Sequence, residues 1–176
     1  MNVHLRSVVD INVKVIESLT ATRNRLVNEI SGLSYENLNK KPDTDTWSVA
    51  QVCHHLYLTE SVFTQAIIYG LNKVNGRKAE TKPIQLTADR TQKAKAPDMV
   101  VPGIEPLEFQ QITELLNHSR NLFFEFYNQL EDKSILKEKS TKHPLFGYLP
   151  LDQWVELIYL HEERHIEQIK EIKSRL

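Results

Sequence analysis

Near its C-terminus the chain carries two histidines whose spacing suits a shared metal ion. In the run His161-Glu162-Glu163-Arg164-His165 the two lie four positions apart. On a helix, side chains at this spacing stand on one face, with their Cβ atoms about 5–6 Å apart. Two imidazoles placed in this way can bind the same ion, at metal–nitrogen distances of about 2.0–2.1 Å for zinc. The spacing therefore predicts a metal-binding pair that needs further ligands from elsewhere in the fold.

The same run also reads H-E-x-x-H, the zinc-protease motif in which the glutamate, here Glu162, is the general base. Such proteases need a third ligand and a sheet beside the helix, whereas few residues follow His165 and no segment is a convincing strand. On a helix, Glu162 also points about 100° away from His161. We therefore predict no protease activity, and we place Glu162 at the surface or behind the metal ligands.

The two histidines belong to the apolar face of their helix. That face is formed by residues at helical spacing, namely Trp154, Ile158, His161, His165, Ile169 and Ile172. Two imidazoles buried in adjacent turns are costly without partners, and a shared metal ion removes that cost. This placement favours a metal site over a pair of surface histidines.

Four segments with apolar residues at helical spacing predict an all-α four-helix bundle. The expected helices lie near residues 11–31, 48–74, 107–131 and 150–175. Ser48, with Gln51 three residues later, approximates a capping box and marks the start of the second helix. The whole chain, residues 1–176, is expected to form a single domain.

A long crossover, residues 76–106, joins the second and third helices. It contains several lysines and prolines and shows no apolar periodicity, so no regular structure is expected there. Long segments of this kind inside a compact domain are often functional. A plain crossover between bundle helices explains the segment equally well, and the sequence leaves both interpretations open.

A third metal ligand has to come from the remaining histidines, which are His4, His54, His55, His118 and His143. His55 lies on the inner half of the second helix, whereas His54 points about 100° away and is expected at the rim. His118 falls between Leu115 and Leu122 on the third helix and is expected in the core or behind a ligand. His143 lies in a loop that can line the mouth of a pocket. His55 is the best-placed candidate, and the others remain alternatives.

The composition excludes several classes of partner. The 176 residues carry a formal net charge of −1, with a pI of about 6.7, which gives no basic surface for nucleic acid or an anionic membrane. No apolar run is long enough to cross a bilayer, and the N-terminal residues lack the apolar segment of a signal peptide. Cys53 is the single cysteine and is expected to be a small buried side chain rather than a nucleophile. A cytoplasmic location fits these features.

Two segments resemble a known family. The run from Trp47 to Leu56 resembles the W-S-x-x-x-x-x-x-H-L segment that begins the second helix in the DinB-like superfamily. The His-Pro-Leu-Phe-Gly sequence at 143–147, followed by Trp154 and by H-x-x-R-H-x-x-Q-I from His161, resembles the closing segment of the same proteins. With the four-helix layout and the long second connection, the resemblance covers nearly the whole chain.

The resemblance implies a metal site and an activity. Members are four-helix bundles that bind a divalent metal through three histidines, which correspond here to His55, His161 and His165. Three neutral imidazoles leave coordination positions open, as a catalytic metal needs, and they suit zinc, nickel and copper alike. Characterised relatives include bacillithiol S-transferases and mycothiol-dependent maleylpyruvate isomerases, in which the metal holds a low-molecular-weight thiol as the nucleophilic thiolate.

These observations lead to three functional hypotheses. The first is a divalent-metal-dependent enzyme acting on small molecules, a thiol S-transferase in detoxification that uses zinc, nickel or a similar ion and a thiol such as bacillithiol. The second is a hydrolase in which the same metal activates water. The third is a metal-binding protein without catalysis. A homodimer is the expected assembly, because relatives often pair and two-fold dimers are the commonest oligomers.

Overall fold

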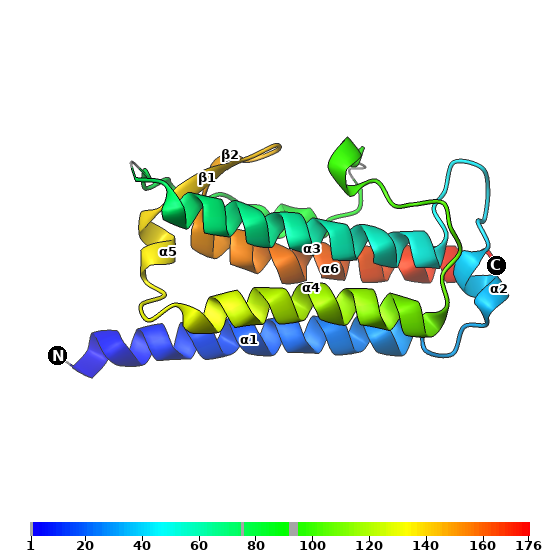
Figure 1. Cartoon of the computed structure of the whole chain (residues 1–176), viewed down its shortest axis with the longest axis horizontal. Coiled ribbons are helices and arrows are strands. Elements are labelled where there is room, and N and C mark those ends of the chain that lie inside the picture. The colour runs from blue at the N-terminus through cyan, green and yellow to red at the C-terminus, as the bar shows by residue number, and fades with distance from the viewer. Residues whose placement is uncertain (1, 75, 92–94) are drawn as a thin grey trace.

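The computed structural model describes residues 2–74, 76–91 and 95–176, with side chains from residue 13 onward. Four long helices run side by side along the long axis of this part of the chain (Figure 1). They are α1 (Asn2–Ile30), α3 (Val49–Asn72), α4 (Phe109–Gln129) and α6 (Leu151–Lys173). The predicted four-helix bundle is confirmed, and most helix ends lie within two residues of their expected positions. The exception is α1, which begins at Asn2 because no proline or glycine interrupts the segment before residue 11.

The start of α3 is fixed by the capping box that the sequence predicts. The Ser48 hydroxyl accepts a hydrogen bond from the backbone N–H of Gln51 at 3.2 Å, and the Gln51 side-chain oxygen accepts one from the backbone N–H of Ser48 at 3.1 Å. Two backbone donors that the helix itself leaves unpaired are thereby satisfied. The position of this N-terminus determines which side of α3 carries His55.

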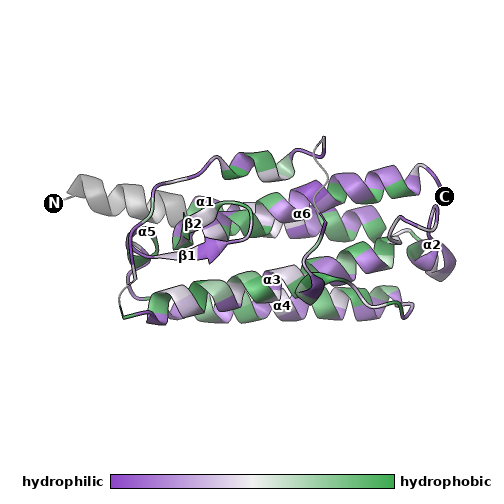
Figure 2. Ribbon diagram, turned by 90° about the horizontal axis from the view of Figure 1, so that it is seen from above, coloured by the Kyte–Doolittle hydropathy of each residue, from purple (hydrophilic) through white to green (hydrophobic). Residues whose placement is uncertain are grey.

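The buried apolar side chains form two groups, one at each half of the bundle. The first includes Leu19, Phe63, Phe123 and Trp154. The second includes Leu26, Leu56, Ile112 and Ile169. The alternating hydrophilic and hydrophobic bands along α3, α4 and α6 show the amphipathic pattern from which both groups are built (Figure 2). Between the two groups lies a layer of polar side chains that carries the candidate site.

The order of these groups along the helices gives the topology. Helices α1 and α6 pass from the first group to the second, whereas α3 and α4 pass from the second to the first. Because α3 and α4 run parallel, the chain between them must return along the length of the bundle (Figure 1). This confirms the predicted long crossover.

The crossover is more ordered than its sequence suggests. It contains two short 3₁₀ helices, η1 (Ile84–Ala88) and η2 (Asp98–Val100), where no regular structure was expected. The η1 segment lies against α6 (Figure 2). Ile84 is fully buried there, and the backbone of Lys82 exchanges two hydrogen bonds of 2.8 Å with the Gln153 side chain. Side-chain packing against α6, rather than local periodicity, holds the segment in place.

Three short elements complete the described chain. Helix α2 (Tyr35–Asn39) lies between α1 and α3. Helix α5 (Ile135–Glu138) follows α4 and leads into a hairpin of β1 (Ser140–His143) and β2 (Gly147–Pro150). The expectation of no strands is wrong here, because the two strands are too short to show a periodic pattern. Their antiparallel register pairs Ser140 with Pro150 and His143 with Gly147, and Gly147 has a φ of 70°, which favours glycine. Among the described residues, no helix has the length and apolar character that crossing a bilayer requires.

Candidate metal centre

Three histidines from two helices meet in the polar layer. His55 comes from α3, and His161 and His165 come from successive turns of α6. Their ring centroids are 4.4–5.1 Å apart, and one nitrogen of each ring lies within 4.8 Å of the others. The Nε2 atoms of His161 and His165 are 3.1 Å apart. Nitrogens that bind one zinc ion tetrahedrally lie about 3.3 Å apart, so the donor set fits a divalent ion after a small inward movement of His55.

Hydrogen bonds at the far side of two rings fix how they face one another. Nδ1 of His55 lies 2.7 Å from the backbone oxygen of Val100, and Nδ1 of His165 lies 2.7 Å from the side-chain oxygen of Gln168. Both partners are acceptors, so in each ring Nδ1 carries the proton and Nε2 presents its lone pair. This is the arrangement that orients histidines in metal sites.

The crossover supplies part of this support. Val100 lies in η2, and Arg90, just after η1, donates a hydrogen bond of 3.3 Å to the Gln168 oxygen that His165 also uses. Arg90 is itself held by two hydrogen bonds to Glu171, at 2.9 and 2.7 Å. The segment left open by the sequence is therefore more than a plain connection, because it positions two of the three rings.

Burial keeps the three imidazoles neutral. It lowers the pKa of His55, lowers that of His165 to about 3, and lowers that of His161 well below the ordinary value. The neighbouring rings act in the same direction, since each would repel a second positive charge. Neutral imidazole is the form that binds a metal ion, so the site is ready for a cation at neutral pH.

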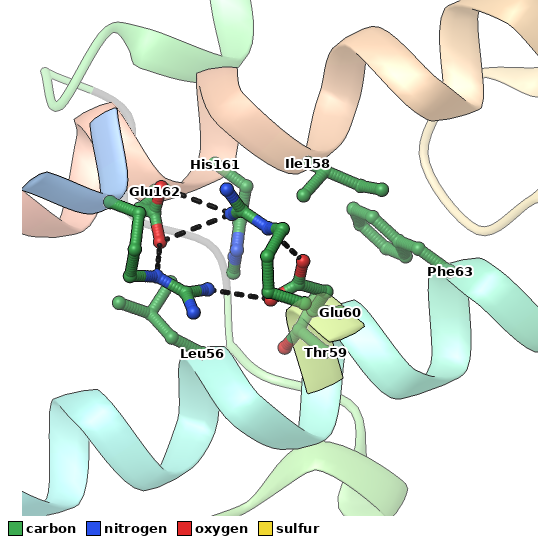
Figure 3. A pocket seen from close by; sticks show the side chains of 9 residues that line it. Leu56, Thr59, Glu60, Phe63, Ile158, His161 and Glu162 are labelled. Atoms are coloured by element: carbon green, nitrogen blue, oxygen red, sulfur yellow. Dashed lines mark hydrogen bonds and ion pairs between the residues drawn. The ribbon is translucent and has the colours of Figure 1, made fainter. Parts of the chain in front are cut away.

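Beside the histidines, four charged side chains form a buried network that joins all four long helices. Its members are Arg23 from α1, Glu60 from α3, Arg120 from α4 and Glu162 from α6. Arg23 contacts Glu60 and Glu162, each at 2.7 Å, and Arg120 contacts the same two carboxylates at 2.5 and 3.2 Å (Figure 3). The four charges balance, and each side chain is less than a tenth exposed.

This network was not predicted from the sequence, although the sequence contains a signal for it. Arg23 stands between Leu19 and Leu26 at helical spacing, so it occupies the apolar face of its helix. Arg120 holds the same position relative to Leu116 and Phe123. A charge inside an apolar stripe requires an opposite charge from another helix, and four such positions in one chain could have been matched to one another.

Of the two positions expected for Glu162, the surface is excluded, because the residue is 2% exposed and lies beside His161 in the interior. Its carboxylate accepts hydrogen bonds from Arg23, from Arg120 and from the hydroxyl of Thr22. Burial alone would raise the pKa of Glu162, but the two guanidinium groups hold it below its ordinary value. A carboxylate bound in this way is a poor general base, which agrees with the prediction against protease activity.

A cavity of about 10 Å³ lies between the network and the histidines. Its wall includes Thr59, Glu60, Phe63, Ile158, His161 and Glu162 (Figure 3). This volume is about the minimum that a single water molecule needs. The interior side of the site thus has room for one heavy atom.

Residues 18–169 match the sequence profile of the DinB superfamily. The chain belongs to this superfamily. The uncharacterized protein YuaE of Bacillus subtilis (strain 168) is 31% identical to it over 149 residues, which cover 85% of this chain and 91% of YuaE.

Two solved structures share the DinB bundle at low sequence identity. TT2238, described as a four-helix bundle protein, matches with a TM-score of 0.60 at 16% identity and covers 90% of this chain and 97% of its own. YfiT from Bacillus subtilis is described as a probable metal-dependent hydrolase with an unusual four-helix bundle topology. It matches with a TM-score of 0.62 at 17% identity, over 92% of this chain and 85% of YfiT. These two likenesses show the common fold.

The other histidines of this DinB chain lie outside the cluster. His54 is half-buried at the rim, as expected, where it accepts a hydrogen bond from the backbone N–H of Gly103 at 3.1 Å. His118 is exposed, so its expected place in the core or behind a ligand is wrong. It lies two positions after the buried Leu116, which places it about 200° around the helix from that residue. Leu122, which we had taken as part of the same apolar face, is 44% exposed. The side chain of His4 lies outside the described residues.

His143, at the end of β1, is buried, whereas the sequence led us to expect it in a loop at the mouth of a pocket. It is 7% exposed and packs against Phe63 and Trp154, with ring centroids 6.0 and 4.9 Å away. Its Nδ1 accepts hydrogen bonds from the backbone N–H groups of Leu145 and Phe146, and burial lowers its pKa to about 4. Because Phe63 of α3 also contacts His161, at 5.9 Å between centroids, His143, Phe63 and Trp154 together form an aromatic wall beside the centre.

Proposed function

We propose that this DinB protein is a divalent-metal-dependent enzyme that acts on small molecules, and that His55, His161 and His165 hold the metal. The observation that carries the proposal is the set of three neutral imidazoles, two buried and one half-buried, whose nitrogens lie within 4.8 Å of one another. Val100 and Gln168 already orient two of the rings. An accidental group of core histidines would not need such aligned lone pairs.

The residues around the site define what the protein contributes to a reaction. Three protein ligands leave coordination positions for other molecules, and a bound ion acts there as a Lewis acid that lowers the pKa of a thiol or of water. The three rings would hold the ion, Val100 and Gln168 would maintain the orientation of two of them, and Phe63 would cover one side of the site. With a net charge of −1, the chain offers no basic surface for a nucleic-acid substrate.

We favour thiol S-transfer, because the sequence resembles bacillithiol S-transferases. In such a step the thiol gives its proton to solvent, and its sulfur forms a bond to an electrophilic carbon while a carbon–halogen bond, or the carbon–oxygen bond of an epoxide, breaks. The released group leaves as halide, or as an alkoxide that takes a proton from water. A low-molecular-weight thiol such as bacillithiol would be the second substrate, and zinc or nickel would suit the three imidazoles.

Hydrolysis is the second candidate, and YfiT supports it because that protein has the same fold and is described as a probable metal-dependent hydrolase. The chain itself offers a hydrolase little help with proton transfer. The two carboxylates that line the cavity, Glu60 and Glu162, are both bound to Arg23 and Arg120. A water attack here would have to rely on the metal alone.

The test begins with the metal content of the purified protein and continues with turnover. Metal-loaded protein is incubated with a haloarene or an epoxide, with and without bacillithiol. Conjugation that requires both the thiol and His165 supports thiol transfer, whereas turnover with water alone supports hydrolysis. Full metal occupancy without turnover across a broad panel of electrophiles would leave a metal-binding protein as the conclusion.

A further inference from the structure

One buried hydroxyl of α3 faces the candidate centre instead of its own helix. Ser61 and Thr64 each donate to the backbone oxygen four residues earlier, both at 2.9 Å. The hydroxyl of Thr59 lies instead 3.5 Å from Nε2 of His55. Thr59 is only 5% exposed, so solvent does not satisfy this hydroxyl.

The tautomer of His55 determines whether Thr59 is the donor or the acceptor in this contact. Nδ1 of His55 donates to Val100, so Nε2 is the nitrogen that faces a metal ion. Once an ion takes the lone pair of Nε2, the Thr59 hydroxyl loses its nearest acceptor. A buried hydroxyl without a hydrogen-bond partner is energetically unfavourable, which favours a new acceptor close to the ion.

The small cavity offers a place for such an acceptor. Thr59 and His161 both line it, so it adjoins the histidine cluster on the interior side. Its other polar walls are committed elsewhere: Glu60, for example, accepts from Arg23, Arg120 and Ser119. With about 10 Å³, the cavity is at the lower limit of the volume that one water oxygen needs.

We propose that the Thr59 hydroxyl donates a hydrogen bond to the non-protein ligand atom at the open coordination position and thereby orients it. This role rests on the proposed metal site. The ligand is a thiolate sulfur or a water oxygen, since both accept a hydrogen bond, and the cavity beside Thr59 has about the volume of a water oxygen. Thr59 thus selects for ligands that present a small, electron-rich donor atom toward the interior of the bundle.

The experiment uses full-length protein loaded with cobalt(II), whose visible spectrum reports its ligands. Two probes, 2-mercaptoethanol and azide, are titrated into the wild type and into Thr59→Val, Thr59→Ser and Thr64→Val. Thr64 is the matched control, because it is a buried threonine on the same helix whose hydroxyl bonds to its own backbone. The affinity for cobalt itself is measured separately by competition with a chelator.

We expect Thr59→Val to bind cobalt within about two-fold of the wild type but to bind mercaptoethanol about ten-fold more weakly, the loss of one hydrogen bond. Thr59→Ser should restore binding, and Thr64→Val should leave it unchanged. A loss confined to mercaptoethanol assigns the hydrogen bond to a thiolate, and a loss with both probes extends it to water-like donors. If Thr59→Val does not fold, Thr59→Ser and Thr59→Ala give the same comparison, since they differ only in the hydroxyl.

Two results would overturn the proposal, and only one of them would also exclude the metal site. Unchanged binding of both probes to cobalt-loaded Thr59→Val would eliminate the role of Thr59 and leave the metal site standing. A folded wild-type protein that binds no cobalt would eliminate the metal site and the role of Thr59 together.

Discussion

The backbone oxygen of Val100 accepts a hydrogen bond from Nδ1 of His55 at 2.7 Å. This contact joins the crossover to the one candidate ligand that does not come from α6. Because the acceptor is a backbone atom of η2, its position depends on how η2 is held against α3. The crossover is therefore a structural part of the centre, and changes in it are expected to affect metal affinity.

Gln168 provides a direct test of ring orientation. Gln168→Leu removes the acceptor for Nδ1 of His165, and the loss of such a partner typically weakens metal binding about 10–100-fold. Zinc affinity measured against a chromophoric chelator checks this expectation. Gln168→Glu, which keeps an acceptor oxygen, should retain most of the affinity. Equal affinities in the wild type and Gln168→Leu would show that the hydrogen bond does not orient the ring.

His165→Ala is expected to abolish metal binding, because it removes one of the three proposed ligands and the Nε2 partner of His161. Metal content per protein chain after dialysis is the measurement. His118→Ala is a suitable control, since His118 is exposed and outside the cluster. Full occupancy in His165→Ala would show that the ion, if bound, has other ligands.

Glu162→Gln is expected to lower stability by about 3–5 kcal/mol, because it leaves two buried guanidinium groups incompletely paired. Urea denaturation provides the free energy of unfolding. Glu163→Gln is the neighbouring control: its ion pair with Arg25 is exposed, and such pairs contribute about 0–1 kcal/mol. Activity per folded molecule should persist in Glu162→Gln, whereas a zinc protease would lose nearly all of it.

Cys53 is expected to be unreactive in the folded protein. It is 1% exposed, and burial raises the pKa of its thiol to about 12, so little thiolate exists at pH 8. Labelling with a thiol-reactive disulfide reagent should be slow in buffer and fast in denaturant. Rapid stoichiometric labelling of the native protein would contradict the packing of α3.

The assembly is expected to be a homodimer, as two-fold dimers are the commonest oligomers. Light scattering coupled to size-exclusion chromatography at micromolar concentration measures the mass. A mass of 20.5 kDa, that of one chain, would count against this expectation.

The sequence predicted those features that depend on local periodicity. The apolar stripes located the long helices, and the spacing of His161 and His165 placed both rings on one face of α6. His118 shows the limit of this approach, because neighbouring apolar residues such as the exposed Leu122 made an outer face look like an inner one. The network around Glu162 was missed for a different reason: its charged residues can be recognised on the apolar stripes of four helices, but local periodicity within one helix does not pair them with one another.

The buried charge network has a consequence for the alignment of the helices. Sliding one helix by a single turn, about 5.4 Å, would leave its charge against apolar side chains without a counter-ion. Such a shift exceeds the 4.8 Å within which the three histidine nitrogens lie. The network therefore fixes the axial position of α3 relative to α6, because Arg23 contacts both Glu60 and Glu162. It thereby also keeps His55 opposite His161 and His165.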